Sequence, residues 1–251
     1  MHILLVNDDG IYAQGIRTLA SVLARKHRVT VVAPHAEMSG TGHAVTFNRH
    51  IQCTKLQIMQ GADCYAITGT PADCAKFGYE YILQGQQVDC LISGINNGYN
   101  LGTDVVYSGT VNAALEGAEL RLPSIAISQN YGLPHYMYAA QFLDQNLEQL
   151  LQRIPQDNAT ILSINVPHCD ADLIRGVRFC RTGVRRYDDC YHADGARGYY
   201  ITGKPLYDAT NAKDSDVICA EQGYVTISPI RSDINDYTVL ERLKNGEGLC
   251  K

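Results

Sequence analysis

The alternation of short apolar, β-branched runs with amphipathic stretches over residues 1–130 constrains the fold of this chain more than any other feature. Residues 2–7 and 28–33 are nearly all apolar, as strands covered on both faces are. Between them, residues 16–24 place their apolar side chains at helical spacing. Repetition of such β-α-β units predicts an α/β protein with a Rossmann-like, doubly wound and mostly parallel sheet.

The same patterns predict the remaining elements. We expect extended segments at 43–47, 64–68, 88–93, 123–128 and 160–166, and helices over 71–83, 110–120 and 135–153. The helix at 71 has the clearest start, because Thr70 can cap it, Pro71 suits the first helical position and Asp73 can close a capping box. A Gly/Asn-rich loop is expected over 94–103.

From residue 176 onward the pattern changes to short extended segments, which indicates hairpins rather than further β-α-β units. We therefore expect a single domain over 1–251. Its Rossmann-like core would span 1–169, and a C-terminal β-hairpin arm with a closing strand and helix would span 170–251.

Charge and hydropathy exclude several classes of partner. The formal charge is −5, from 21 Lys and Arg against 26 Asp and Glu, which argues against a nucleic acid polymer or an anionic membrane. The apolar runs are far shorter than the ~20 residues of a membrane span. The first strand-like run begins at Met1 with no signal peptide ahead of it. We therefore expect a soluble, cytoplasmic protein.

The nine cysteines are scattered, odd in number, and never at CxxC spacing. This pattern argues against a disulfide framework and against a thiolate zinc site. We expect most of them to be reduced, small, buried side chains.

Four polar clusters follow predicted strands. They are Asn7–Gly10, Ser39–Gly42, Ser93–Gly102 and Tyr107–Thr110. Adjacent residues of a strand point to opposite faces, so Asp8 and Asp9 can share a site only if the strand ends there and the chain turns, which Gly10 permits. Each cluster alone also fits a turn or a helix cap, so the prediction of a site rests on their coming together at the carboxyl ends of the strands.

The residue types in these clusters favour phosphate chemistry with a hard cation. Carboxylate, hydroxyl and amide oxygens suit Mg²⁺ or Mn²⁺ rather than zinc. Glycines and hydroxyls at 39–42 can present backbone N–H groups to an anion, and the helix that begins near Thr110 favours a phosphate at its N-terminus. We call Ser39–Gly42 the serine loop. His43 directly follows it, and its side chain could either transfer a proton or serve only in packing.

The motifs resemble those of the SurE family, the survival protein E enzymes, which are 5′/3′-nucleotidases also described as acid phosphatases. The matching segments are NDDG at 7–10, AP....SG at 33–40, GTPADC at 69–74, SGIN.G.NLG at 93–102, YSGTV at 107–111 and GYVTISP at 223–229. They occur in the family's order over nearly the whole chain. Any one of them alone is a weak signal, but the set is specific.

The resemblance implies a metal-dependent phosphomonoesterase that hydrolyses nucleoside 5′- and 3′-monophosphates, with an exopolyphosphatase side activity as a further possibility. It implies one divalent cation per subunit, Mg²⁺ or Mn²⁺, and a homodimer or homotetramer formed with the help of the arm. The implied metal ligands are Asp8, Asp9, Ser39 and Asn96, and the two aspartates are also the expected catalytic residues. The expected substrate-binding residues are Asn7, Gly40, Thr41, Ser108, Gly109 and Thr110.

Departures from the family pattern affect the surroundings of the metal rather than its ligands. Residues 35–38 read HAEM where the family often has an Asp-Arg pair, so a positive charge near the phosphate is missing. Asp233 is retained beyond the last motif, but Tyr237 stands where a histidine is sometimes found. The proton donor therefore stays open among His43, Asp233 and water.

Alternatives remain for the chemistry. Attack by an activated water is favoured over a covalent aspartyl-phosphate, because the DxD phosphatases place their carboxylates two residues apart and these are adjacent. A nucleotide-binding module without catalysis uses the same loops. An NAD-dependent dehydrogenase is excluded, because no GxGxxG follows the first strand.

Two further patterns have a structural and a functional interpretation. A basic stretch suits either a solvated strand edge or a site for polyphosphate; it comprises Arg175, Arg178, Arg181, Arg185 and Arg186. A set of tyrosines suits either arm packing and oligomer contacts or stacking on a base; it comprises Tyr199, Tyr200, Tyr207 and Tyr224.

Overall fold

The computed structural model describes residues 1–131, 136–155, 160–167 and 170–245. Its strands are β1 (His2–Val6), β2 (Arg28–Pro34), β3 (Cys53–Leu56), β4 (Ala62–Ile67), β5 (Cys90–Asn97), β6 (Ser124–Gln129), β7 (Thr160–Val166), β8 (Val177–Phe179), β9 (Arg186–Ala193), β10 (Tyr199–Leu206) and β11 (Val225–Arg231). Its α-helices are α1 (Gln14–Leu23), α2 (Pro71–Phe77), α3 (Gly109–Glu119), α4 (Met137–Gln152), α5 (Asp216–Glu221) and α6 (Tyr237–Asn245).

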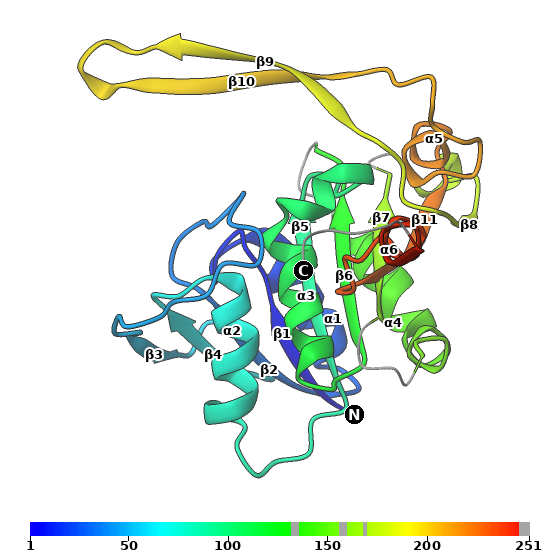
Figure 1. Ribbon diagram of the computed structural model, residues 1–251. Helices are drawn as coiled ribbons and strands as arrows, with labels where there is room; N and C mark the ends of the chain where they lie inside the picture. Colours follow the sequence, from blue (N-terminus) through cyan, green and yellow to red (C-terminus); the bar gives the residue numbers. More distant parts are fainter. Residues whose placement is uncertain (132–135, 156–159, 168–169, 246–251) are drawn as a thin grey trace.

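The main sheet has the strand order β3-β4-β2-β1-β5-β6-β7-β11-β8 (Figure 1). Its central run from β4 to β7 is parallel throughout, and this run has the strand order of the Rossmann fold. The antiparallel pairs are β3 with β4 and β11 with β7. The predicted α/β class and mostly parallel sheet are therefore confirmed, and the direction of chain progress reverses between β1 and β5, where such folds bind ligands.

Two hydrophobic layers enclose the sheet, and β1 shows how one strand supplies both. Ile3 and Leu5 belong to the core on the side of α1 and α4, whereas Leu4 and Val6 belong to the core on the side of α2 and α3. All four side chains are completely buried. This is why the strand reads as an unbroken apolar run rather than as an alternation.

Several elements differ from the sequence prediction. Residues 43–47 form no strand, and the exposed edge strand β3 was not predicted because its side chains carry no apolar alternation. β5 continues to Asn97 through part of the expected loop, since it stays paired with β6 across a register shift between Gly94 and Asn96. The helix predicted over 71–83 is α-helical only to Phe77 and continues as a π-helical turn, Gly78–Ile82.

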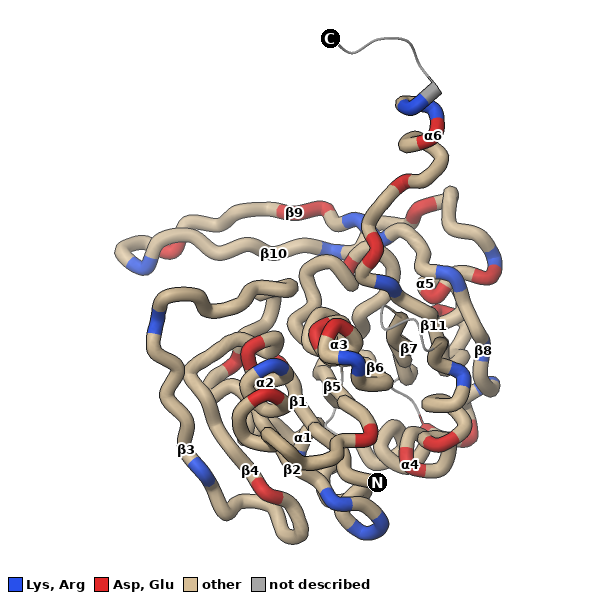
Figure 2. The backbone as a smooth tube through the Cα atoms, turned by 60° about the horizontal axis from the view of Figure 1, so that its bottom comes forward, with Lys and Arg blue, Asp and Glu red and all other residues tan. Residues whose placement is uncertain are grey.

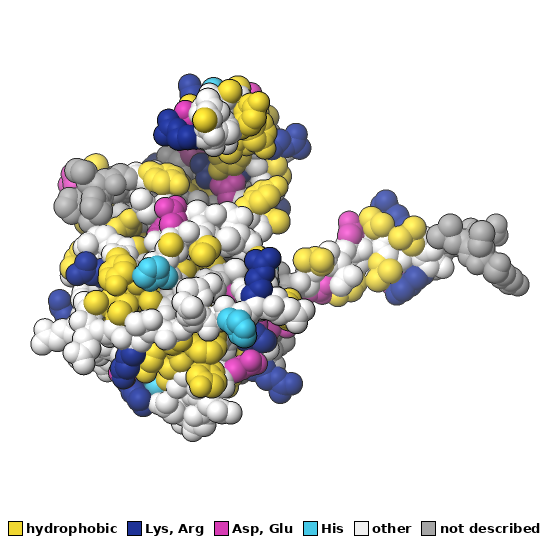
Figure 3. Space-filling view, turned by 90° about the vertical axis from the view of Figure 1, so that its left-hand side faces the viewer, with side chains coloured by type: hydrophobic (Ala, Val, Ile, Leu, Met, Phe, Trp, Pro, Cys, Tyr) yellow, Lys and Arg dark blue, Asp and Glu magenta, His cyan; other side chains and the backbone are white. Residues whose placement is uncertain are grey.

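The C-terminal third contributes to two structures. β8 and β11 extend the main sheet, while β9 and β10 form a separate antiparallel hairpin that projects from the body as the predicted arm (Figures 1 and 2). We call β9 and β10 together the arm. Figure 3, which looks along the arm, shows apolar and charged side chains mixed at its end. Beyond β11, α6 also points away from the body (Figure 2).

No helix in the described part of the chain is long and apolar enough to cross a membrane. The seven described cysteines all carry free thiols, of which Cys53 and Cys190 are exposed. Cys169 and Cys250 lie outside the described residues, as does His135 at the predicted start of the helix over 135–153.

Candidate functional site

The ends of β1 and β5 bring three of the four polar clusters together. The chain turns after β1 at Gly10, whose φ is +97°. The backbone N–H of Asn97 then donates a hydrogen bond to Asp9 Oδ2 (3.1 Å), and the N–H of Met38 donates to the backbone carbonyl of Asp8 (2.8 Å). These bonds hold the end of β5 and the serine loop against the end of β1.

The fourth cluster approaches Asp8 through the first turn of α3. The hydroxyl and the backbone N–H of Thr110 both donate to the Asp8 carboxylate, the latter at 3.1 Å. A Cβ at Gly109 would lie 2.8 Å from Asp8 Cβ, which is too close for any side chain. A glycine is therefore required for the helix to reach the carboxylate.

Burial makes both carboxylates reluctant to ionise. It raises the pKa of Asp8, against the effect of the hydrogen bonds from Thr110. Burial and the adjacent negative charge of Asp8 raise the pKa of Asp9 to about 6. Buried acids with pKa values raised in this way, at the carboxyl edge of a doubly wound sheet, are typical of a functional site.

A cavity of about 280 Å³ opens beside Asp8. Five of the predicted site residues line it, namely Asp8, Ser39, Gly40, Asn96 and Ser108. The Ser108 hydroxyl also accepts a hydrogen bond from the N–H of Val111 (3.0 Å) as the cap of α3. Three of the four implied metal ligands therefore share one cavity.

The other predicted site residues lie behind this surface rather than on it. Asn7 is completely buried and donates to the Gly10 carbonyl (2.9 Å), which secures the turn. Thr41 donates to the Met38 carbonyl (2.9 Å) within the serine loop. Asp9, Gly109 and Thr110 do not line the cavity either, although Asp9 and Gly109 directly follow lining residues and Thr110 is two residues beyond Ser108.

The donor set fits a hard divalent cation. Within the described residues no three acidic, histidine or cysteine side chains come together, so a cation here depends on the neutral oxygens of Ser39 and Asn96 in addition to the carboxylates. The Asn96 amide nitrogen donates to the Gly98 carbonyl (3.0 Å), which leaves the amide oxygen as the ligand atom. Oxygen donors of this kind are those that Mg²⁺ and Mn²⁺ prefer.

The structure adds residues that the sequence did not single out. The cavity is also lined by Asn97, Gly98, Tyr99, Asn100, Asp104, Tyr107, Tyr131 and Tyr187. Most of these belong to the Gly/Asn-rich segment or precede α3, so the motifs already marked their neighbourhood. Tyr187 comes from β9 of the arm, and nothing in its sequence context distinguishes it from the other tyrosines.

None of the four tyrosines named from the sequence lines this cavity. Tyr199, Tyr200 and Tyr207 are exposed on or beside β10. The Tyr224 ring lies close to two guanidinium groups, with the Cζ of Arg175 at 5.2 Å and that of Arg178 at 4.6 Å from its centroid.

The two side chains considered as proton donors also lie outside the cavity lining. His43 pairs with Glu116 through its Nε2 (2.9 Å), and Lys76 reaches the same carboxylate at 3.3 Å. The hydrogen bonds from His43 and Lys76 hold the pKa of Glu116 below its usual range, against its burial. Asp233 is exposed and accepts hydrogen bonds from Tyr237 and Asn235.

The basic stretch is divided among acidic and aromatic partners. Arg185 forms an ion pair with Asp104 (2.7 Å), and Arg181 forms one with Asp214 (2.9 Å). Arg186 lies 3.7 Å from a carboxylate oxygen of Asp208.

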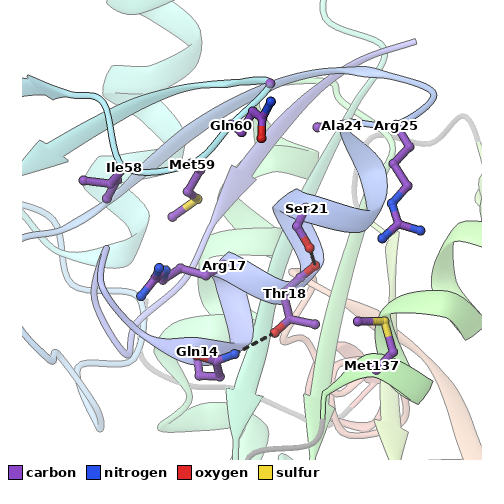
Figure 4. Close-up of a pocket in the computed structure, with 11 residues that line it drawn as sticks. Gln14, Arg17, Thr18, Ser21, Ala24, Arg25, Ile58, Met59, Gln60 and Met137 are labelled. Atoms are coloured by element: carbon purple, nitrogen blue, oxygen red, sulfur yellow. Dashed lines mark hydrogen bonds between the residues drawn. The ribbon is translucent and has the colours of Figure 1, made fainter.

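A second cavity, of about 710 Å³, lies between α1 and the turn that precedes β4 (Figure 4). Arg17 and Arg25 stand at opposite ends of it, with Thr18 and Ser21 between them. Among the residues that the structure describes, no carboxylate, histidine or cysteine lines it. Its size therefore does not make it a competitor for the cation site, because it lacks the ligands.

Comparison with known proteins agrees with the geometry. The family model described as Survival protein SurE matches residues 3–189. Two curated relatives named 5′-nucleotidase SurE are each 42% identical: that of Thermosipho africanus over 97% of this chain and 96% of its own length, and that of Pseudothermotoga lettingae over 98% and 95%. The crystal structure of the SurE protein from Aquifex aeolicus superimposes with a TM-score of 0.83 at 34% identity, covering 98% of this chain and 99% of that one.

Proposed function

Because the chain belongs to the SurE family, we propose that it is a nucleotidase, a phosphomonoester hydrolase that releases phosphate from nucleoside monophosphates. The observation that carries this proposal is the pair of adjacent carboxylates, buried Asp8 and half-buried Asp9, where the chain turns beside a cavity lined by Ser39, Asn96 and Ser108. The curated relatives bear the name 5′-nucleotidase.

The chain's own residues supply binding and orientation. Asp8, Asp9, Ser39 and Asn96 would hold one Mg²⁺ or Mn²⁺ ion. When bound, the cation supplies Lewis-acid polarisation of a phosphoryl oxygen. The N–H groups of the serine loop would hold other phosphoryl oxygens, assisted by the positive end of the α3 dipole, since helix N-termini favour anions. The N–H groups of Thr110 and Val111 in that helix already donate to Asp8 and Ser108.

Asp8 and Asp9 have different surroundings and so suit different tasks. The two hydrogen bonds from Thr110 fix the Asp8 carboxylate in one orientation. Asp9 accepts a single hydrogen bond from the Asn97 N–H, which leaves it more acceptor capacity. We assign Asp9 the orientation of the attacking water, with no covalent enzyme intermediate.

The proposal also includes three more specific features of the enzyme's activity and assembly. They are activity on both 5′- and 3′-monophosphates, a side activity on polyphosphate, and assembly into a homodimer or homotetramer through the arm. The cavity volume of about 280 Å³ suits the phosphate end of one small ligand better than a polymer, and the ion pairs of Arg181 and Arg185 occupy part of the basic stretch.

Phosphate release from purine and pyrimidine nucleoside monophosphates, measured with Mg²⁺, Mn²⁺ and a chelator, tests the proposal. We expect activity with a cation and its loss on chelation. Asp8→Asn should lower kcat by about 10²-fold or more, in the range for loss of a group that stabilises transition-state charge. The matched control is Asp63→Asn, an exposed aspartate paired with Lys55, which should keep full activity.

A binding module without catalysis would give a different result. Nucleotide would bind in the presence of the cation, but no phosphate would be released under any condition. That outcome, or full activity in chelated protein, would contradict the proposed function.

A further inference from the structure

Tyr187 reaches the cavity from the base of the arm, and it contacts both members of the ion pair between Arg185 and Asp104. Its hydroxyl donates to Asp104 Oδ2 (2.7 Å). The Arg185 guanidinium pairs with the same oxygen (2.7 Å), and its Cζ lies 5.4 Å from the centroid of the Tyr187 ring. The ring is therefore anchored at its hydroxyl and has a cation beside it.

The anchor also fixes the ring relative to the phosphate end of the cavity. Asp104 lies in the short 3-10 turn Gly102–Val106, directly before α3. Its backbone carbonyl accepts hydrogen bonds from the N–H groups of Tyr107 (3.0 Å) and Ser108 (3.1 Å). The residue that anchors Tyr187 is therefore hydrogen-bonded directly to Ser108, the cap of α3.

The ring is partly exposed despite these contacts. Tyr187 retains 38% of its accessible surface, and it lines the cavity together with Tyr107 and Tyr131, which are 69% and 73% exposed. Partial burial and the hydrogen bond to the Asp104 carboxylate raise the pKa of Tyr187 well above its usual range, so the phenol stays neutral. Neutral aromatic faces are suitable surfaces for stacking.

The volume of the cavity indicates where the base of a bound nucleotide would lie relative to these tyrosine rings. At about 280 Å³ the cavity is at the lower end of small-ligand pockets, about 300–1,000 Å³. A phosphate held near Asp8 and Ser108 thus leaves the rest of a nucleotide at the rim. Among the lining residues Tyr107, Tyr131 and Tyr187 are exposed to solvent, which is the property expected of residues at the rim.

We propose that the ring of Tyr187 is the surface on which the nucleobase of the substrate stacks, and that Asp104 and Arg185 are its positioning residues. This inference rests on the proposed function and deepens it. The inference means that the enzyme prefers nucleoside monophosphates to phosphomonoesters without an aromatic group, because of a residue at the base of the arm.

The test compares Tyr187→Ala with Tyr187→Phe on two substrates, a purine nucleoside monophosphate and glycerol phosphate. Loss of one stacked base is expected to raise KM for the nucleotide about tenfold in Tyr187→Ala, within the range of base stacking on aromatic side chains. Its kcat, and both constants for glycerol phosphate, should change less than about twofold. Tyr187→Phe should restore most of the nucleotide affinity, because the ring remains.

Tyr199→Ala provides the matched control, since Tyr199 is an exposed tyrosine of β10 that does not line the cavity. It should behave like the unmodified protein. Equal loss of activity on both substrates in Tyr187→Ala would overturn the inference, because it would show that Tyr187 only supports the arm. An unchanged KM for the nucleotide would also overturn it.

Calorimetric binding of a purine nucleoside, which carries no phosphate, separates this inference from the proposed function. We expect Tyr187→Ala to weaken nucleoside binding about tenfold relative to the unmodified protein, as for KM. If nucleoside binding depends on Tyr187 while no nucleotide is hydrolysed, the stacking surface stands and the proposed function fails. If hydrolysis occurs while binding is independent of Tyr187, the reverse holds.

Discussion

Asp8 and Asp9 are neighbours in the chain with different contacts. Asp8 is fixed by Thr110 from α3, and Asp9 is held by the Asn97 backbone from β5. Burying two adjacent carboxylates costs folding stability unless a cation neutralises them, because the charged forms lose hydration and repel each other. We therefore expect the site to lower the folding stability of the cation-free protein, and we expect a bound cation to restore it.

Asp9→Asn should raise the melting temperature of chelated protein at pH 8, which is above the pKa of about 6 of Asp9, because a charge beside Asp8 is removed. Added Mn²⁺ should raise the melting temperature of the unmodified protein and have little effect on the variant, since a ligand stabilises only the state that binds it. Differential scanning fluorimetry measures both quantities. A lower melting temperature for the chelated variant would contradict the assignment of electrostatic strain to this pair.

Some residues of the site could be predicted from the sequence and others could not. Asp8, Ser39, Gly40, Asn96 and Ser108 were predicted and line the cavity, because each belongs to a polar cluster that follows a strand. Their functional roles stay predictions. Tyr187 could not be selected, since its position depends on a contact with Asp104, 83 residues away along the chain.

At the scale of elements, α2 shows which features local sequence determines. The capping box predicted from Thr70 and Asp73 is confirmed, with reciprocal hydrogen bonds between the two residues. The structure adds long-range contacts to it. Asp73 also accepts hydrogen bonds from the N–H and the hydroxyl of Thr46, and Thr70 donates to the Ala44 carbonyl (2.6 Å). The cap therefore holds the segment at 44–46, which was expected to be extended.

Thr70→Ala should lower the free energy of unfolding by about 1 kcal/mol, the usual cost of losing an N-cap. Asp73→Ala should cost more, about 2 kcal/mol or above, because it leaves the donors of Thr46 and Thr70 without their charged acceptor. Ser21→Ala, at an exposed position within α1, is the control and should change stability by less than about 0.5 kcal/mol. Urea denaturation measures all three, and equal values for Thr70→Ala and Ser21→Ala would contradict the role of the cap.

At the scale of the whole molecule, the arm is the feature whose side chains are mostly exposed rather than packed against the body. β9 and β10 pair only with each other in the described part of the chain, and nearly all their residues are exposed. Among these are apolar side chains such as Tyr191, Tyr200, Ile201 and Leu206. An isolated two-stranded hairpin has marginal stability in water, so we expect the arm to pack against further copies of the chain.

Shortening the arm tests this at the same scale. Asp189 and Gly203 are cross-strand partners, so residues 190–202 can be replaced by a two-residue Asn-Gly turn that suits a hairpin. We expect the full chain to sediment as a dimer or tetramer and the shortened chain to have a lower mass. Circular dichroism should show that the body remains folded. A monomeric full chain, or an unchanged mass after shortening, would contradict the assembly role.

The sequence alone determined the class of fold, the helix cap of α2 and the region of the site. These features depend on periodicity and on short motifs, which act through residues close together in the chain. The tertiary structure alone decided the extent of β5, the pairing of His43 with Glu116 and the entry of Tyr187 into the cavity. These depend on which distant segments meet when apolar faces are buried, and a side chain's partners across such a contact leave no local pattern in the sequence.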